Sequence, residues 1–200
     1  MSAQFPSPPT ESLAAGGWRE RERRESVAFD AKVVTVEAAT VVYEDEALRE
    51  RVREETGLDR LWRFFVASRL ALSPPTEPSG PLTRLVADRA HAGFADTLAE
   101  RGFEGVRRAD PVDDAGAAAR IGTDARVATY EALCRLDGVD VRARGCAAVR
   151  PSGDAYLLAG GAYPTAVRRA PDDATGDALS RALEPERFRE ELYELIRETG

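Results

Sequence analysis

The sequence predicts a single α+β domain in which a central antiparallel β-sheet is flanked by helices. Two observations carry this prediction. Residues 123–163 form three apolar and β-branched runs separated by turn-forming residues, which is typical of an antiparallel meander. Two stretches, one beginning at Pro81 and one near Glu186, repeat apolar residues at the three- and four-residue spacing of an amphipathic helix.

The length and composition of the chain indicate what kind of protein it is. The chain has 200 residues, of which 43% are hydrophobic, enough for one domain with its own core. Prolines near the start predict a disordered lead-in over residues 1–12, and residues 13–200 are expected to form the domain. No stretch has the length and apolarity of a membrane span, and the N-terminus lacks the pattern of a signal peptide, so we expect a cytoplasmic protein that does not contact a membrane.

The charged residues are strongly biased. Lys32 is the single lysine among 28 basic residues, asparagine is absent, and 35 acidic residues give a formal net charge of −7. The bias is typical of GC-rich coding, and the acidic excess favours a halophilic host, because a Debye length of about 3 Å at 1 M salt screens carboxylate repulsion. A GC-rich soil bacterium is the alternative. The net acidity also argues against a nucleic-acid partner.

The first part of the chain predicts strands and one short helix. Arginine and glutamate alternate over Trp18–Glu25, so the local charge nearly cancels, which indicates an exposed edge strand. Val27–Tyr43 is rich in β-branched residues and is expected to be extended. Glu44–Thr56 predicts a charged helix that ends at Gly57.

The middle of the chain continues this alternation. Trp62–Leu72 predicts a strand with its large apolar residues on one face and Arg63 on the other. Ser73–Pro81 contains four prolines and is expected to be a loop, and a helix then runs from Pro81 until Gly102 ends it. Asp110–Gly122, with a proline and two glycines, is expected to be a loop that follows a short strand around Val106.

The meander is the most specific prediction. Asp137-Gly138 favours a tight two-residue hairpin turn, because both central positions of such a turn need a positive φ. Pro151–Asp154 predicts the second turn, and Ala155–Tyr163 the third strand. The register of the first hairpin places two opposite-charge pairs on neighbouring strands: Arg135 beside Asp140, and Glu131 beside Arg144. A last helix is expected from about Glu186 to Thr199, with a shorter one before Pro185.

The same register separates the two cysteines. Cys134 and Cys146 fall on neighbouring strands but on opposite faces, so no disulfide is expected between them. His91, the only histidine, lies within the helix that starts at Pro81 and is expected to be an ordinary helix residue. One histidine cannot form a histidine-based metal cluster, and no phosphate-binding glycine loop is present, so we expect no catalytic set, no metal site and no cofactor.

Two short strings carry a family resemblance. They are Gly17-Trp18-Arg19-Glu20 near the start and Ala159-Gly160-Gly161-Ala162-Tyr163-Pro164 at the end of the meander. With the overall layout, they resemble an uncharacterised protein family of halophilic archaea, many of whose members are lipoproteins. At the level of the fold, the family is similar to the Mog1/PsbP-like group, which implies an accessory or partner-binding role rather than a common enzyme activity. This chain lacks the lipidation cysteine of those relatives, so membrane anchoring is not implied here.

Two functions remain open at this stage. The first is a non-catalytic accessory or partner-binding module, whose partner is expected to be another protein. Its groove would be lined by aromatic residues and the proline that follows one of them: Trp18, Trp62, Tyr163 and Pro164. The alternative is a small-molecule enzyme with a carboxylate–arginine site around Glu131, Arg142 and Arg144.

Overall fold

The computed structural model describes residues 4–30, 34–136 and 138–200, and within these it confirms the α+β class. In the described residues, seven strands form one sheet in the order β1-β2-β3-β7-β6-β5-β4, and each pair of neighbours is antiparallel. The strands are β1 (Trp18–Asp30), β2 (Thr35–Asp45), β3 (Phe64–Ser73), β4 (Phe103–Arg108), β5 (Arg126–Leu136), β6 (Val139–Ser152) and β7 (Ala155–Arg169). The helices are α1 (Thr10–Ala15), α2 (Glu46–Thr56), α3 (Gly80–Glu100), α4 (Pro111–Ile121), α5 (Asp173–Ala182) and α6 (Pro185–Glu198).

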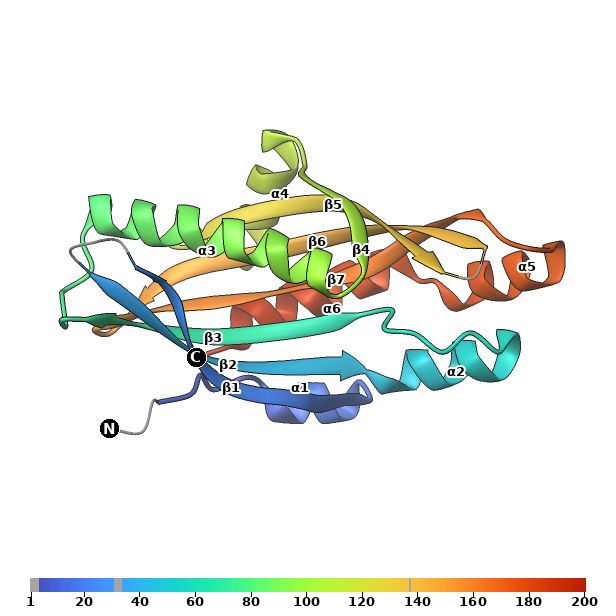
Figure 1. Cartoon of the computed structure of the whole chain (residues 1–200), viewed down its shortest axis with the longest axis horizontal. Helices are drawn as coiled ribbons and strands as arrows, with labels where there is room; N and C mark the ends of the chain where they lie inside the picture. The colour runs from blue at the N-terminus through green and yellow to red at the C-terminus, as the bar shows by residue number, and fades with distance from the viewer. Residues whose placement is uncertain (1–3, 31–33, 137) are drawn as a thin grey trace.

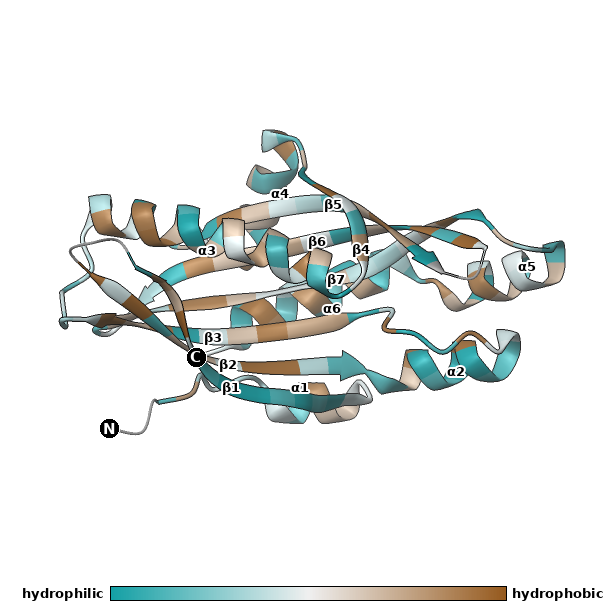
Figure 2. Ribbon diagram, viewed as in Figure 1, coloured by the Kyte–Doolittle hydropathy of each residue, from teal (hydrophilic) through white to brown (hydrophobic). Residues whose placement is uncertain are grey.

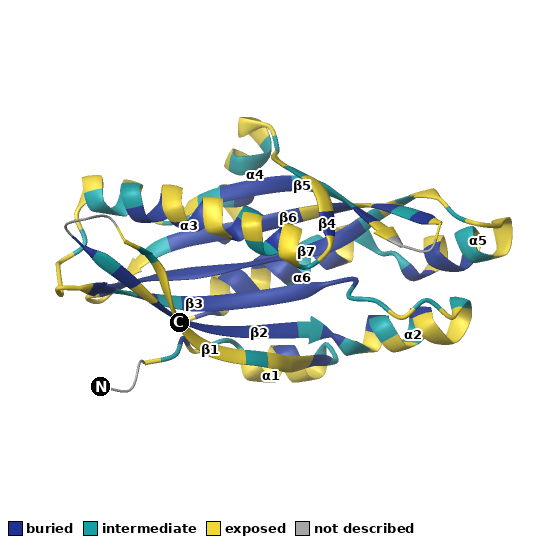
Figure 3. Cartoon of the chain, in the orientation of Figure 1, coloured by how far each residue is buried: buried dark blue, intermediate teal, exposed yellow. Residues whose placement is uncertain are grey.

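Helices cover both faces of the sheet. In Figure 1, α3 crosses in front of the sheet and α6 lies behind it. The central strands are therefore buried on both sides, and Figure 3 shows β2, β3, β6 and β7 mostly in the buried colour while the outer side of α3 is exposed. The buried apolar side chains of strands and helices form one contiguous cluster.

The edge of the sheet is polar, as the sequence indicates. β1 is the outermost strand on one side, and Figure 2 shows most of it as hydrophilic. Its arginines and glutamates pair with one another, for example Arg23 with Glu20 at 2.8 Å, and nearly all its side chains are exposed. Charged side chains on an edge strand disfavour pairing with a strand of another molecule.

The meander is confirmed in its strands and its register. Leu136 pairs with Val139, and both expected charge pairs are present, Arg135 with Asp140 at 3.8 Å and Arg144 with Glu131 at 3.5 Å. Asp137 lies outside the described residues, and Gly138 has a φ of +83°. Ser152 pairs with Ala155, so the second turn falls within the predicted stretch.

The cysteine prediction is also confirmed. Cys134 pairs with Val141 and Cys146 with Thr129, which places the two thiols on opposite faces of the sheet, and both are free and buried. Helices α2, α3, α5 and α6 and the short strand β4 likewise form where the sequence predicts them.

Two expectations were wrong. Asp110–Gly122 is not a loop, because Pro111 occupies the first turn of a helix, α4, where its missing N–H costs nothing, and the alanines that follow favour helix. Tyr163 does not end the third strand: β7 continues to Arg169. Pro164 is tolerated there because it lies opposite a register shift in β6, between Arg142 and Ala143, where the ladder is already interrupted.

The described residues of the N-terminal stretch contact the rest of the chain. In the described part, α1 begins at Thr10, and Ser7 exchanges backbone hydrogen bonds with Gly200 at 2.7 and 3.0 Å. The side chain of Phe5 packs against the core, and the guanidinium of Arg23 lies 4.8 Å from the centre of its ring.

Candidate functional site

One face of the sheet is partly open, and it is the face opposite α3. The side chains of β6 alternate, so Arg142, Arg144 and Cys146 point to one side while Gly145 points towards Leu98 of α3 on the other. Helices α4 and α6 cover only part of the open side. Two adjoining hollows lie there, and Arg144 lines both.

The smaller hollow, which we call the tyrosine cavity, has a volume of about 220 Å³ and lies between α4, α6 and the sheet. The helices present side chains to it at helical spacing, Asp113, Gly116 and Arg120 from α4, and Arg189 and Tyr193 from α6. The strands supply the floor: Thr129, Tyr130, Arg144, Gly145, Cys146 and Tyr163.

Two contacts hold the helices in place over the cavity. Asp114 of α4 accepts hydrogen bonds from the backbone N and the hydroxyl of Thr129, both at 2.7 Å, which fixes α4 to β5. Gly161 of β7 lies directly beneath Leu192 of α6, and a Cβ added there would meet Leu192 at 2.9 Å and would also overlap the carbonyl oxygen of Phe64. Gly161 therefore marks a site of close backbone packing, which a side chain would prevent.

The phenols of Tyr163 and Tyr193 and the thiol of Cys146 in the tyrosine cavity stay protonated at neutral pH. Burial raises the pKa of Tyr193 to about 12, and it also raises the pKa of Tyr163 well above its ordinary value, against the opposing effect of the nearby guanidiniums. Burial likewise raises the pKa of Cys146. The phenols are therefore hydrogen-bond donors here, and the thiol is not poised as a nucleophile.

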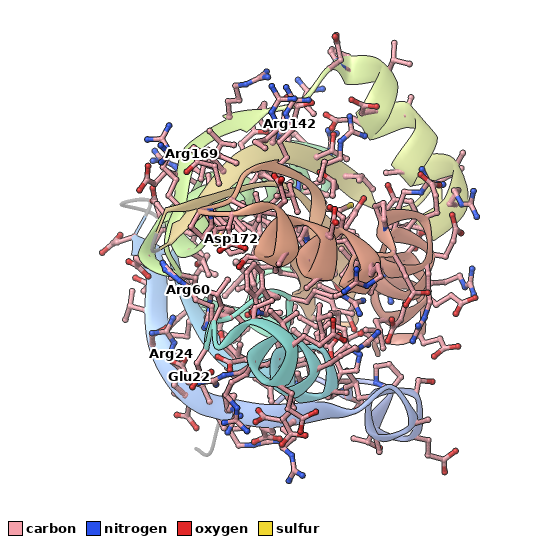
Figure 4. All side chains as sticks on the ribbon, turned by 90° about the vertical axis from the view of Figure 1, so that its right-hand side faces the viewer. Glu22, Arg24, Arg60, Arg142, Arg169 and Asp172 are labelled. Carbon is pink, nitrogen blue, oxygen red and sulfur yellow. The ribbon has the colours of Figure 1, made fainter. Side chains whose placement is uncertain are left out.

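The larger hollow is an open surface of about 870 Å³ beside the cavity. We call it the arginine face after the five arginines that line it: Arg107, Arg142, Arg144, Arg168 and Arg169. Between them lie the half-exposed Ala132 and Leu133 and the exposed Ala166, so the arginine face combines cationic and apolar atoms. Figure 4 shows Arg142 and Arg169 in the upper part of the molecule, away from Glu22 and Arg24 of β1.

Among the described residues, two carboxylates line the arginine face, and both are already engaged. Glu131 is contacted by Arg107 and, at 3.5 Å, by Arg144. Asp140 lies 3.5 Å from Arg169. Positive charge is thus in excess on this face of a chain whose net charge is −7.

Arg142 and Arg168 account for much of this excess. Both side chains are exposed, and among the described residues neither has a carboxylate within ion-pair distance. Unpaired guanidiniums side by side repel each other, and they present free donors to an incoming carboxylate or phosphate.

The four residues predicted for a partner groove are not brought together at the surface. The side chains of Trp18, Trp62, Tyr163 and Pro164 are all buried. Tyr163 lines the tyrosine cavity, whereas the indole N–H of Trp18 donates to Glu191 at 2.8 Å and that of Trp62 has no hydrogen-bond partner in the described part of the chain. Their role in partner binding stays a prediction.

The three residues of the alternative enzyme site do come together. Glu131, Arg142 and Arg144 all line the arginine face. Sequence reasoning missed the other arginines of this face, and it missed Arg189 and Tyr193 in the cavity. The usable signals were the Arg168-Arg169 pair after an extended run and the four-residue spacing of Arg189 and Tyr193.

A second arginine cluster is buried and structural. Arg63, predicted on the face away from the core residues, has a side chain only 2% exposed and binds Asp45 at 2.7 Å and Glu191 at 3.0 Å. Its guanidinium also lies 4.7 Å from the Trp18 ring centre and 4.2 Å from that of Phe188. We call these five residues the Arg63 cluster. Its single guanidinium is bound by two carboxylates inside the cluster, so it has no free cation to offer an anionic ligand.

His91 also has a structural role. It is buried on α3, and its Nε2 lies 3.1 Å from the carbonyl oxygen of Arg126 in β5. Burial, helped by the guanidinium of Arg108, lowers its pKa to about 4. The ring is therefore neutral at pH 7.

Comparison with known proteins places the chain in a family. A family model described as a domain of unknown function, DUF6517, matches residues 5–200. The chain belongs to this family. No curated protein and no solved structure matches it. In the part of this family member that the structure describes, no helix is long and apolar enough to cross a membrane, and no group of three or more histidine, cysteine or acidic side chains is placed to hold a metal ion.

Proposed function

We propose that the protein is a non-catalytic binding module whose arginine face binds an acidic segment of another protein. The observation that carries the proposal is the local excess of arginine on an open sheet face of an acidic chain. Two of these arginines, Arg142 and Arg168, have no carboxylate partner among the described residues.

The surface suits a polypeptide better than a nucleic acid. Arginine is enriched at protein–protein interfaces and binds carboxylates through two parallel hydrogen bonds. The alanines and Leu133 between the arginines offer apolar contact that a phosphate backbone would not use. A polyanionic nucleic acid would also meet long-range repulsion from the remaining negative charge of the chain.

The chemistry on this face supports binding rather than catalysis. The carboxylate of Glu131 is held by two guanidiniums, Arg107 and Arg144, so it is already occupied as an acceptor. In the adjoining cavity, the raised pKa values of the phenols and of Cys146 work against their use as a base or a nucleophile near pH 7. The enzyme built on Glu131, Arg142 and Arg144 stays the alternative.

The finer expectations from the sequence are carried as part of this proposal. We propose a cytoplasmic protein of a halophilic archaeon, related to a family that includes lipoproteins and to the Mog1/PsbP-like fold group. The support is the resemblance of the Gly17–Glu20 and Ala159–Pro164 strings and the acidic, lysine-poor composition.

Binding of defined peptides tests the proposal. Fluorescence anisotropy of the full chain would be measured with a labelled peptide of alternating glutamate and leucine, with its lysine and leucine counterpart, and with a single-stranded RNA. We expect only the acidic peptide to bind. Arg142→Ala combined with Arg168→Ala should weaken binding roughly tenfold or more, because hydrogen bonds to charged groups contribute about 1.5–3 kcal/mol each.

A matched control separates this surface from general charge. Arg84 and Arg89 are exposed on α3, on the opposite side of the sheet, and the double change Arg84→Ala and Arg89→Ala removes the same charge. It should leave peptide binding unchanged. Equal loss in both double variants, tighter binding of RNA, or turnover of a small molecule that depends on Glu131 would overturn the proposal.

A further inference from the structure

The tyrosine cavity differs from the arginine face in size and in chemistry. It is a half-open hollow bordered by α4, α6 and the sheet, and at about 220 Å³ it is smaller than the roughly 300–1,000 Å³ of a pocket for a drug-sized ligand. Gly116 and Ala117 of α4 form an apolar part of the wall, flanked on the same helix by Asp113 and Arg120, and the phenols of Tyr163 and Tyr193 come from β7 and α6. A ligand for this space is a small molecule with one polar end.

The hydroxyl groups of the five tyrosines differ in their hydrogen bonding. Three of them are hydrogen-bonded within the protein: that of Tyr43 to Glu20 at 3.2 Å, that of Tyr130 to the backbone of His91 at 2.8 Å, and that of Tyr156 to Thr83 at 3.2 Å.

The other two phenols, Tyr163 and Tyr193, both line the cavity. Among the described residues neither hydroxyl has a hydrogen-bond partner, although the side chains are only 4% and 9% exposed. Neither oxygen is among the fully buried atoms that lack a partner, so both hydroxyls are open to the cavity and free to donate to an acceptor placed in it.

The charges around the two phenols select an anion. The guanidiniums of Arg144 and Arg189 are close enough to both phenols to affect their pKa. Arg144 lies 3.5 Å from Glu131 and 3.8 Å from Asp113, whose carboxylate also lines the cavity, and Arg189 lies 3.1 Å from Glu190. These contacts keep both guanidiniums at the edge of the cavity. An anion placed here would meet hydrogen-bond donors and positive charge together.

We propose that the tyrosine cavity binds the anion of a small carboxylic acid. The hydroxyls of Tyr163 and Tyr193 donate to its two oxygens, Arg144 and Arg189 balance its charge, and a short apolar tail packs on Ala117 of α4. This function is separate from the binding of a protein segment by the arginine face.

The test uses the full chain and defined probes. Acetate, butyrate and benzoate would be titrated as potassium salts, with inorganic phosphate and chloride for comparison, and the thermal midpoint and the heat of binding would be recorded. We expect at least one carboxylate to raise the midpoint at millimolar concentration, because a ligand that binds only the folded state stabilises it. Phosphate and chloride at equal ionic strength should not.

Tyr163→Phe combined with Tyr193→Phe removes both hydroxyls and keeps both rings. It should weaken carboxylate binding at least tenfold. Tyr43→Phe combined with Tyr156→Phe removes two hydroxyls elsewhere and should leave binding unchanged.

Several outcomes would overturn the proposal. They are equal binding by wild type and the cavity double variant, tighter binding of phosphate than of any carboxylate, and no carboxylate response at all. Arg142→Ala with Arg168→Ala, which lie outside the cavity lining, should bind carboxylates as the wild type does, so failure of this proposal and failure of the peptide-binding proposal can be told apart.

Discussion

The Arg63 cluster and the arginine face use the same side chain for opposite purposes. In the Arg63 cluster, one guanidinium is 2% exposed, is bound by Asp45 and Glu191, and lies against two aromatic rings. On the arginine face, five guanidiniums share two carboxylates on an open surface. The first arrangement satisfies the charge within the protein, and the second leaves it for something else.

The difference lies in how each charge is solvated. Removing Arg63 from water is costly, and that cost is offset by the two carboxylates that its guanidinium binds in place, those of Asp45 and Glu191. Asp45 shows the same balance, since burial raises its pKa while the guanidinium of Arg63 and a hydrogen bond from the backbone of Leu48 oppose the rise. Arg142 and Arg168 remain in water and contribute little to folding, so their placement is better explained by binding.

The largest effect should therefore come from replacing Arg63, and it should be a loss of folding stability. Arg63→Met keeps most of the apolar stem but leaves Asp45 buried beside Glu191 with no cation. Breaking a buried pair in this way should lower the free energy of unfolding by about 3–5 kcal/mol. Urea unfolding followed by circular dichroism measures the change.

A second variant shows whether the unpaired charge is the cause. Asp45→Asn added to Arg63→Met removes the buried negative charge but keeps a side-chain oxygen to accept from the backbone N of Leu48. The double variant should be more stable than Arg63→Met alone. If it is less stable, the loss comes from packing against Trp18 and Phe188, and the contrast between the two regions weakens.

The contrast also explains what the sequence could and could not predict. The meander was predictable in register because its determinants are local: Asp137-Gly138 sets the hairpin, and the paired charges follow from alternation. The burial of Arg63 was not predictable in the same way. Alternation assumes one solvated face, whereas β3 lies at the centre of a sheet covered by helices on both sides.

The candidate site depends still more on tertiary structure. Arg144 and Tyr163 lie on neighbouring strands of the meander, and their proximity follows from pairing. Tyr193 and Arg189 reach them from α6, far along the chain, and α4 closes the cavity although its proline and glycines indicate a loop. Local helix propensity does not determine which face of the sheet a helix covers, or how much of a strand the helix leaves exposed.

The next largest effect should come from His91, which lies in a third kind of charge environment, and it should appear as a change of stability with pH. His91 is buried like Arg63 but has no carboxylate bound to it, and its pKa falls from 6.5 to about 4. Between these pH values the unfolded chain takes up a proton that the folded chain does not, so stability is complete above about pH 6.5 and is lost as the pH falls towards 4. The loss should reach about 2–3 kcal/mol.

Comparison with His91→Gln isolates this contribution from that of the carboxylates. Glutamine does not titrate, and its amide can still donate to the carbonyl oxygen of Arg126. Unfolding free energies measured from pH 7.5 to pH 4 should fall more steeply for the wild type than for the variant. Parallel curves would show that His91 has the same pKa in both states.

The smallest effect should come from a change in salt concentration. It tests most directly whether positive charge on the arginine face is in excess. On moving from molar to tenth-molar KCl the Debye length grows from about 3 to about 10 Å, so a chain of net charge −7 should lose some thermal stability without unfolding. Arg84→Ala with Arg89→Ala removes two positive charges from exposed positions on α3 and should deepen this loss. Arg142→Ala with Arg168→Ala removes the same charge, but it also relieves repulsion among the clustered arginines. The double variant at Arg142 and Arg168 should therefore lose less stability in low salt than the double variant at Arg84 and Arg89. The difference should lie within about 0.5 kcal/mol, the range of ordinary surface substitutions.

Differential scanning calorimetry of the three proteins across the KCl range measures this difference. If both double variants respond alike, the arginines of the face do not repel one another, and their positive charge is not in excess. A midpoint of the wild type that does not change with KCl would instead count against a high-salt host and favour GC-rich coding as the origin of the composition.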